Sequence, residues 1–242
     1  MGVIALLDCF IHVHGHDFTT DSNSGQLATE TAPLDKTTFG SAGWTELHGG
    51  LKSWTLALKG FWQSDTSDAV DPEIFNGLGS TGQVFTLGPV ETEAQVAYFA
   101  QGGKFNYQLL GQLGELAPFT LASQGTSGQG VIRGQLAKAR GVVSAAGQVG
   151  SALNLGAGAA GKFLYATVHT FLAGTTVTIQ VQSDTASNFP TPTTVATFPA
   201  ITARGASWLV RVDSTGITDT WWRLNVSAIT GSFTVAGAIG IQ

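Results

Sequence analysis

The sequence predicts an all-β protein: a β-sandwich or barrel with one short helix, followed by a second, smaller β-sandwich. Three observations support this fold class. Apolar and polar residues alternate over many short segments, 32 glycines are spread along the chain, and charged residues make up only 11% of the 242 residues. Alternation is typical of strands with one buried face, and glycine-rich connections are typical of the tight turns between them.

The first half is expected to consist of short strands with one long irregular loop. The loop covers residues 34–50 and holds four glycines. In the strand after it, Trp54, Leu56 and Leu58 share one face because side chains alternate along a strand. Strands are predicted at residues 5–18, 26–31, 51–61, 83–87, 94–100, 104–113, 116–123 and 131–139.

The single predicted helix begins near residue 71. Asp71 is a suitable N-cap, and Pro72 stands in the first turn, where its missing N–H costs nothing. Gly77 or Gly79 is expected to end the helix. An element this short can close one end of a sandwich.

The composition changes after residue 140. Residues 141–161 carry no charge and are mostly Gly, Ala, Ser, Val and Gln. We therefore predict a first domain over residues 1–140 and an additional β-sandwich domain over 150–242. The strand pattern of the second half includes the alternating apolar positions Val177, Ile179, Val181, Trp222, Leu224 and Val226.

The charge balance argues against a protein whose main function is to bind nucleic acid tightly. The net charge is −5, and the 11 basic residues are scattered, whereas phosphate binding requires clustered Lys and Arg. A surface past which DNA slides is compatible with this balance. The low charge content also predicts that partners cover much of the surface, so we expect an obligate assembly.

The N-terminal segment and the cysteine content restrict the environment. Asp8 interrupts the apolar start, and neither a basic region nor a small-residue cleavage site accompanies it, so no signal peptide is predicted. No run approaches the roughly 20 apolar residues of a membrane helix. Cys9 is alone, which excludes an internal disulfide. We expect a protein made in a cytoplasm, without a membrane partner.

The histidines are the best metal-site candidate, although we favour no metal. His12, His14 and His16 lie two residues apart, so on one strand their imidazoles would share a face and resemble a zinc ligand set. No further ligand follows at a suitable spacing, and a polar strand face is the favoured interpretation. The sequence holds no nucleophile elbow and no acid–base constellation. We therefore predict no enzyme activity, no catalytic residues and no cofactor.

The most distinctive stretch is residues 34–62, LDKTTFGSAGWTELHGGLKSWTLALKGFW. Its order of features resembles the tail tube proteins of long-tailed bacteriophages, and the resemblance covers about the first 140 residues. The matching residues are Leu34, Asp35, Thr37, Thr38, Phe39, Gly40, Gly43, Trp44, Gly50, Leu51, Lys52, Gly60, Phe61 and Trp62.

The resemblance implies a structural virion protein with a tail-tube-type β-sandwich or barrel. Tail tube proteins form rings, usually hexameric, that stack into the tube through which DNA passes. The implied partners are further copies of the chain, the tape measure, terminator and baseplate proteins, and passing genomic DNA that is not bound tightly. The second domain would lie outside the tube. The implied inter-ring or inter-subunit contact residues are Phe39, Trp44, Leu51, Lys52 and Trp54.

Two alternatives stay open. One is a different virion component, such as a baseplate or head decoration protein. The other is a carbohydrate-binding β-sandwich module in which Trp208, Trp221 and Trp222 form an aromatic platform.

Overall fold

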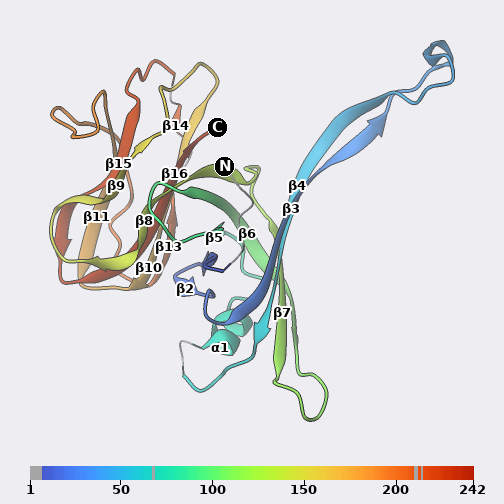
Figure 1. Cartoon of the computed structure of the whole chain (residues 1–242), viewed down its shortest axis with the longest axis horizontal. Helices are drawn as coiled ribbons and strands as arrows, with labels where there is room; N and C mark the ends of the chain where they lie inside the picture. The colour runs from blue at the N-terminus through green and yellow to red at the C-terminus, as the bar shows by residue number, and fades with distance from the viewer. Residues whose placement is uncertain (1–6, 67–68, 210–211, 214) are drawn as a thin grey trace.

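Two β-sheets organise the chain (Figure 1). The computed structural model describes residues 7–66, 69–209, 212–213 and 215–242. The strands are β1 (Phe10–Val13), β2 (His16–Asp17), β3 (Ser22–Asp35), β4 (Leu47–Phe61), β5 (Gln83–Gly88), β6 (Val96–Leu109), β7 (Pro118–Gly125), β8 (Ile132–Val143), β9 (Gly147–Asn154), β10 (Phe163–Leu172), β11 (Thr176–Asp184), β12 (Thr193–Thr197), β13 (Gly205–Trp208), β14 (Val212–Asp213), β15 (Trp221–Thr230) and β16 (Phe233–Ile241).

The predicted all-β fold class is confirmed. Helical structure in the described part of the chain is limited to α1 (Val70–Asn76) and the 3₁₀ turn η1 (Phe39–Ser41). None of the helices described is long and apolar enough to cross a bilayer. The expected end of the helix at Gly77 is confirmed, whereas Asp71 is not its cap. The N-cap is Ala69, and the Asp71 carboxylate accepts a hydrogen bond from the Tyr107 hydroxyl instead, at 2.8 Å.

The first half forms a curved antiparallel sheet around one apolar core. Its strand order is β2–β1–β5–β6–β7–β4–β3. Trp54, Leu56 and Leu58 face inward from β4, as alternation predicts, and meet Phe119 and Leu121 from β7. The predicted strand at 5–18 is instead two short strands, β1 and β2, with a turn between them; residues 5 and 6 lie outside the described residues.

The second half is a β-sandwich. One sheet has the order β12–β11–β15–β9, and β8, β10, β13 and β16 of the larger sheet cover it. The predicted alternation supplies the core: Val177, Ile179 and Val181 pack with Trp222 and their neighbours in one buried cluster. The rule that inward positions repeat every second residue therefore holds in this half.

One sheet runs through both halves of the chain. β8 pairs with β6 on one side and with β16 on the other. A buried cluster accompanies this continuity, in which Phe99 and Leu136 pack with Tyr165 and Ala238. The uncharged tract at 141–161 contains the end of β8 and all of β9. The division into domains 1–140 and 150–242 stays a prediction, and the two halves are joined by backbone hydrogen bonds.

A buried histidine strengthens this junction. The His169 Nδ1 atom, on β10, accepts a hydrogen bond from the Gly15 backbone N–H at 3.5 Å, and its Nε2 lies 2.8 Å from the Thr86 hydroxyl. With Nδ1 as acceptor, the neutral ring donates its Nε2 proton to Thr86. Burial, with smaller contributions from His12 and His14, holds the pKa of His169 well below its usual value. A protonated ring would lose the bond to Gly15.

We predict that acid weakens the fold through His169. Between the ordinary histidine pKa of about 6.5 and the lower folded value, the unfolded chain binds a proton that the native chain does not, so stability falls as pH drops. The slope contributed by one such group is at most about 1.4 kcal/mol per pH unit. Urea unfolding at pH 7 and pH 5.5 measures it. His169→Gln should reduce the pH dependence, whereas His48→Gln, at an exposed arm position, should not. Equal pH dependence in wild type and His169→Gln would contradict this role.

Candidate assembly interface

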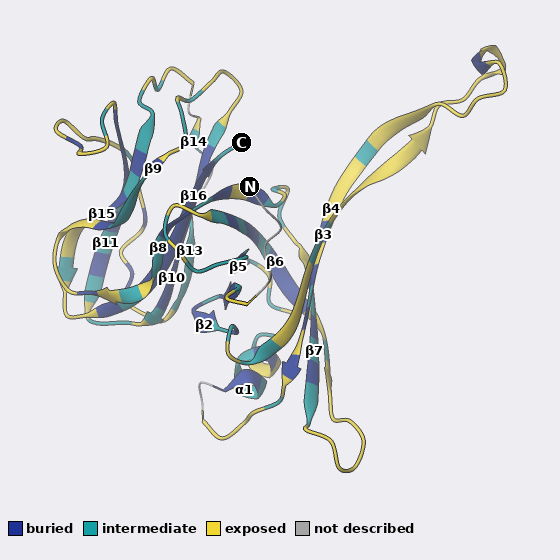
Figure 2. Ribbon diagram, viewed as in Figure 1, coloured by how far each residue is buried: buried dark blue, intermediate teal, exposed yellow. Residues whose placement is uncertain are grey.

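A two-stranded arm projects from the first half (Figure 1). β7 pairs with β4 only over residues 55–61, while the β3–β4 ladder continues to the pair Asp35–Leu47. The ribbon therefore extends roughly 20–25 Å beyond its last third-strand neighbour, at about 3.3 Å per residue. Figure 2 shows that nearly all of this ribbon is exposed. The sequence predicted a loop over residues 34–50, and the structure has an extended hairpin there.

A register shift shapes the middle of the arm. The β3–β4 pairing moves by one residue between Thr31 and Pro33, where Gly50 lies opposite. A Cβ atom on Gly50 would come within 2.9 Å of both the Ala32 carbonyl oxygen and the Leu34 Cγ atom. Glycine is therefore required for the two strands to approach at this bulge.

The tip of the arm is ordered by its own hydrogen bonds. The Thr38 side chain accepts from the Gly40 N–H, and the Ser41 side chain accepts from the Thr38 N–H, which forms a capping box around η1. The Asp35 carboxylate accepts from the Thr37 N–H at 2.8 Å; hydrogen bonding by Thr37 lowers the pKa of Asp35. These local bonds give the tip a defined shape in the absence of a core.

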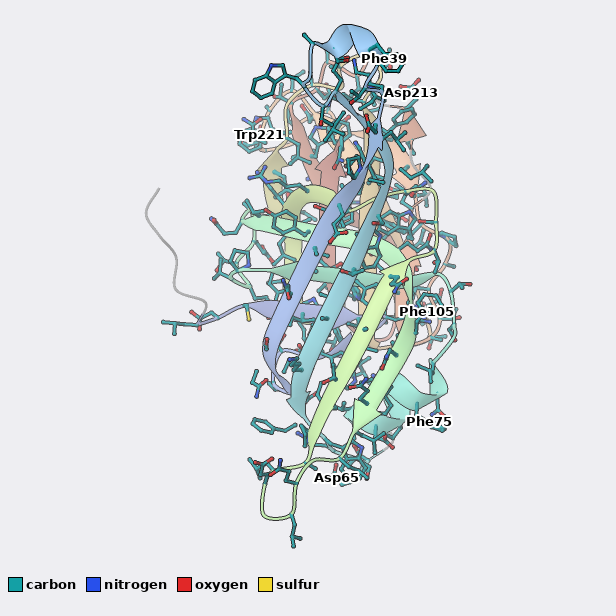
Figure 3. The ribbon with its side chains drawn as sticks, turned by 90° about the vertical axis from the view of Figure 1, so that its right-hand side faces the viewer. Phe39, Asp65, Phe75, Phe105, Asp213 and Trp221 are labelled. Carbon is teal, nitrogen blue, oxygen red and sulfur yellow. The ribbon has the colours of Figure 1, made fainter. Side chains whose placement is uncertain are left out.

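The arm displays large apolar side chains to solvent. Phe39 is fully exposed, Leu51 is 88% exposed and Trp44 is 79% exposed. Figure 3 shows Phe39 at the extreme end of the molecule. Leu34 and Leu47 are also exposed on the same ribbon. Soluble proteins rarely display such a group unless a partner covers it, so the arm is the strongest candidate for an interface.

The structure separates the five predicted contact residues into two groups. Phe39, Trp44, Leu51 and Lys52 are exposed on the arm. Trp54 is only 4% exposed and packs edge-on against Phe85 in the core, with ring centroids 5.7 Å apart. Its side chain faces the same way as Leu56 and Leu58 and is unavailable to a neighbouring subunit. Trp54 anchors the arm and is omitted from the proposed contact set.

Sequence reasoning missed two residues of the arm surface, Leu34 and Leu47. Both lie in the predicted loop, and neither was named as a contact residue, although Leu34 was among the residues that carry the resemblance. The available signal was their apolar character at the two ends of a polar, glycine-rich segment. Once the strands pair, Leu34 lies opposite His48, and Leu47 lies opposite Asp35.

The outer face of the β3–β4–β7–β6 sheet is polar but nearly uncharged. Among the residues of these four strands whose side chains point away from the core, two are charged, Glu30 and Lys59. The other side chains on this face are small or neutral. They are Ser24, Gln26, Ala28, Ser53, Thr55, Ala57, Phe61, Asn106, Gln108, Pro118, Thr120, Ala122 and Gln124.

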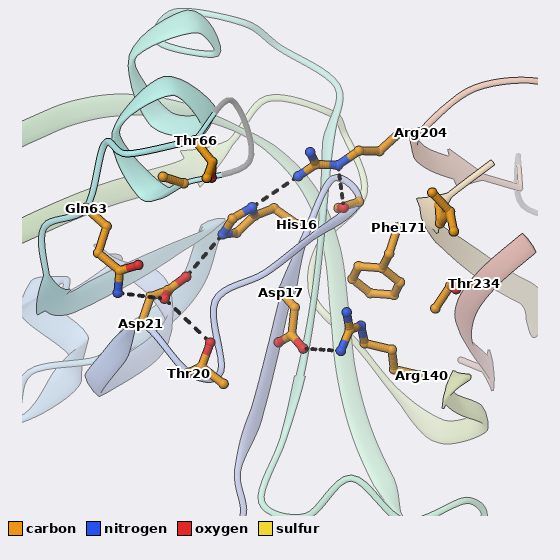
Figure 4. A pocket seen from close by; sticks show the side chains of 13 residues that line it. His16, Asp17, Thr20, Asp21, Gln63, Thr66, Arg140, Phe171, Arg204 and Thr234 are labelled. Atoms are coloured by element: carbon orange, nitrogen blue, oxygen red, sulfur yellow. Dashed lines mark hydrogen bonds and ion pairs between the residues drawn. The ribbon is translucent and has the colours of Figure 1, made fainter. Parts of the chain in front are cut away.

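A polar pocket of about 470 Å³ lies at the junction of the two halves (Figure 4). Arg204 donates to the Gly15 carbonyl oxygen at 2.9 Å and lies 3.1 Å from the His16 Nδ1 atom. Arg140 forms an ion pair with Asp17 at 3.5 Å and lies over the Phe171 ring. The charged groups pair with one another, and their contacts hold the second half against the β1–β2 hairpin.

The three candidate histidines do not gather into a ligand set: among the described residues, no group of three or more His, Cys, Asp or Glu side chains is placed to hold a metal ion. His12 is buried with its Nε2 atom 3.4 Å from a Glu91 carboxylate oxygen, and the His16 Nε2 atom lies 3.2 Å from the Asp21 carboxylate. Gly15 and His14 both have positive φ, which turns the chain between β1 and β2 and separates the three rings. The favoured interpretation, one polar strand face that carries the three rings, is wrong, because His12 and His16 lie on separate strands and both are buried.

The three tryptophans proposed for a carbohydrate platform do not form one. Trp222 is fully buried and donates its indole N–H to the Gly156 carbonyl oxygen at 3.0 Å. Trp208 belongs to the other sheet and donates to Gln129. Successive residues of β15 point to opposite faces, so Trp221 and Trp222 cannot stack one ligand together.

Comparisons with known proteins found distant structural similarity. No family model and no curated protein matches the chain. A chain in the virion of a native gene transfer agent particle is 18% identical over 51% of this chain and 95% of that one, with a TM-score of 0.41. The SPP1 Dit protein, described as a paradigm of the hub adsorption apparatus in phages infecting Gram-positive bacteria, is 11% identical over 96% and 98%, with a TM-score of 0.37. A chain of the activated phage p2 baseplate is 8% identical over 98% of both, with a TM-score of 0.34. These scores are below 0.5 and do not establish a family.

We predict that the two arm tryptophans differ sharply in their effect on stability. Trp54→Ala should lower the free energy of unfolding by about 3–5 kcal/mol, because it removes a buried aromatic side chain and leaves a cavity. Trp44→Ala should change it by less than about 0.5 kcal/mol, because its side chain contacts solvent. Urea denaturation of both variants tests the comparison. Similar losses in the two would mean that Trp44 packs within its own chain.

Proposed function

We propose that this chain is a structural protein of a phage tail that polymerises as stacked, hexameric rings to form the tail tube. The arm carries the proposal. It is an extended ribbon with an ordered tip and exposed Phe39, Trp44 and Leu51, and no described part of the chain covers these side chains. The resemblance of residues 34–62 to tail tube proteins supports the same assignment. No catalytic role is part of the proposal.

Free strand edges support the closure of a ring. β3, which is 14 residues long, pairs with β4 along one edge, and no strand of the described residues pairs with its other edge. At the opposite side of the same sheet, β6 pairs with β5 only as far as Gly102, so no described strand pairs with residues 105–109 on that side. Long unpaired edges are templates for another strand. Sheet addition between neighbouring copies would join these edges and remove both from solvent.

The uncharged sheet face supports the role of a conduit. The face carries only Glu30 and Lys59 as charges, so a ring with this face inward would neither attract nor strongly repel the phosphates of passing DNA. The second half would then lie on the outside. The tape measure, terminator and baseplate proteins are the proposed neighbours of the finished tube in the virion.

A baseplate ring is the second candidate, and the continuous sheet favours it. The second half is joined to the first through β8 and β16 rather than by a flexible linker. A rigid, outward-facing sandwich suits a ring that occurs once at the end of a tail and positions other proteins. The two candidates differ in their assembly: a tube protein stacks without limit, whereas a baseplate protein stops at one or two rings.

We expect Trp44→Ala to impair assembly without unfolding the chain. The variant removes the largest exposed aromatic side chain of the arm, which is the kind of residue that dominates protein interfaces. Negative-stain microscopy and sedimentation should detect fewer and shorter tubes, with an unchanged circular dichroism spectrum. Leu172→Ala, which removes an exposed apolar side chain away from the arm, is the matched control. Normal tubes from Trp44→Ala would count heavily against the proposed role of the arm.

We also expect assembled protein to pass through a DNA column without retention at about 100 mM salt. The chain has 16 acidic and 11 basic residues, and the proposed lumen face has no basic cluster. Real phosphate binding would weaken steeply with added salt because counterions are released. The variant Thr55→Lys/Gln124→Lys adds two positive charges to neighbouring positions on that face and should produce salt-sensitive retention. Strong retention of the wild-type assembly would refute the proposal that DNA passes this face without binding to it.

A further inference from the structure

We propose that acid opens the contact between the β1–β2 hairpin and strands β10 and β13, while the rest of the chain stays folded. We call this contact the seam. Gly15 and His16 form it on the side of the hairpin, and His169 and Arg204 form it on the other side. The inference goes beyond the proposed function and does not depend on it, because the seam lies within one chain.

The seam joins the two ends of the larger sheet. Its main path runs β13–β10–β16–β8–β6–β5–β1–β2, and β2 returns to contact β10. A Cβ atom on Gly15 would lie 2.7 Å from the Thr170 carbonyl oxygen and from the backbone N and O atoms of Gly205, so the turn lies directly on these strands. Among the described strands, no ladder pairs β2 with β10 or β13. Side chains therefore hold the two ends together in place of backbone pairing.

Two histidines hold the seam as hydrogen-bond acceptors. The His169 Nδ1 atom accepts from the Gly15 N–H at 3.5 Å. The His16 Nδ1 atom lies 3.1 Å from the Arg204 guanidinium, which has donors only, so this nitrogen is also an acceptor (Figure 4). The same Arg204 side chain donates to the Gly15 carbonyl oxygen at 2.9 Å. Both nitrogens can accept only while their rings are neutral.

Protonation would turn each acceptor into a donor that faces another donor. On His169 the added proton would point at the Gly15 N–H. On His16 it would point at the Arg204 guanidinium, whose positive charge would also repel the ring. A buried donor that faces another donor is unfavourable, because neither group has a partner. Acid therefore weakens both contacts at the same time.

The carboxylates beside His16 do not reverse this effect. The His16 Nε2 atom lies 3.2 Å from the Asp21 carboxylate, and Asp21 and Glu73 both favour the charged ring. Burial outweighs them and, together with Arg204, lowers the pKa of His16. In the closed seam, the neutral ring is thus the favoured form of His16 at neutral pH.

The titratable groups that act on His169 are other histidines. The ring centroid of His12 lies 5.7 Å from that of His169, and burial, followed by His12 and His14, holds the pKa of His169 well below its usual value. Of the five histidines in the chain, only His48, on the arm, lies away from this cluster. The other charged groups beside these rings are Asp17 and Glu91, which face His12, Arg140, which pairs with Asp17, and Lys104, which acts on His14.

The direction of the pH effect follows from the lowered pKa values. In an open, solvated seam, the ordinary histidine pKa of about 6.5 applies. Below that pH the open form binds protons that the closed form does not, so acid favours opening. Each ring raises the equilibrium constant for opening by up to about tenfold per pH unit, and the two together by up to about a hundredfold. The β6–β8 and β8–β16 ladders contain no histidine and keep the two halves joined.

Hydrogen–deuterium exchange of the full chain at pH 7.5 and 5.5 tests the inference. Mass spectrometry measures the exchange, and the rates are corrected for the intrinsic effect of pH. Peptides that cover the β1–β2 turn should lose protection by at least about tenfold at pH 5.5, whereas peptides from β16 should keep theirs. Equal loss in both would mean that acid unfolds the whole chain, and unchanged protection of the turn would mean that the seam ignores pH. Either result would overturn the inference.

The double variant His16→Asn/His169→Asn separates the hydrogen bonds from the titration. The Asn side-chain oxygen is attached to Cγ, as Nδ1 is in histidine, so it can accept the same bonds without taking up a proton in this pH range. The turn should therefore stay protected at both pH values. His48→Asn, on the exposed arm, is the matched control and should behave like the wild type. A pH-dependent loss of protection that persists in the double variant would contradict the assignment to these two rings.

Arg204→Met tests the seam without any change of pH. The variant removes the donor to Gly15 and His16, so protection of the β1–β2 turn should fall by about fivefold or more already at pH 7.5. This result stands even if the double variant does not fold. Protection equal to that of the wild type would show that the Arg204 contacts do not hold the hairpin, and the inference would be wrong. Its failure would leave the proposed assembly unaffected.

Discussion

The structure depends on β4, because one part of this strand is packed in the core and the other part is exposed in the arm. The proximal part of β4 is clamped between β3 and β7, and Trp54, Leu56 and Leu58 bury their side chains in the core. The distal part continues without a break into the arm. A two-stranded ribbon in water is marginally stable by itself, so the arm relies on this clamped root for its direction and on the capping box around Thr38 for the shape of its tip. The core thus fixes where the exposed aromatics are presented.

The second half is fixed to the same framework by two kinds of contact. Backbone pairing of β16 with β8 extends the sheet, and polar contacts from His169 and Arg204 hold the β1–β2 hairpin from the side. Both contacts join segments far apart in sequence: the β8–β16 pairing begins with Val143 opposite Phe233, and Gly15 is bonded by His169 and Arg204. The sandwich therefore keeps a constant position relative to the arm root, which any ring built from this chain would repeat for every subunit.

Sequence patterns predicted the buried strands well and the exposed ones poorly, for a physical reason. Alternation arises when one face of a strand is buried, so it is visible at Val177, Ile179 and Val181 and absent from the arm, where both faces meet solvent. The arm was therefore predicted as a loop, although its function as a contact was proposed. Trp54 shows the reverse problem: its alternation with Leu56 indicated the core, yet the resemblance assigned it to an interface. The pairing of β8 with β16 could not be predicted, because no pattern in the local sequence of either strand indicates its partner.

The distribution of exposed side chains explains how a charge-poor protein could assemble in one direction. Large apolar side chains are exposed on the arm and in the β6–β7 turn, where they include Leu110 and Leu113. The edges of β3 and β6 that pair with no described strand lie along the sides, and the sheet face between them is neutral and polar. Contact at the strand edges and at the exposed apolar side chains is favourable in free energy, because it pairs backbone groups and removes apolar surface from water. Contact across a face of Gln, Thr and Ala is much less favourable. In the assembly that we propose, growth would be favoured sideways into a ring and lengthwise into a stack, and disfavoured across the face. A scattered arrangement of the same residues would promote amorphous aggregation, so the proposed tube would depend on this segregation of apolar and polar surface.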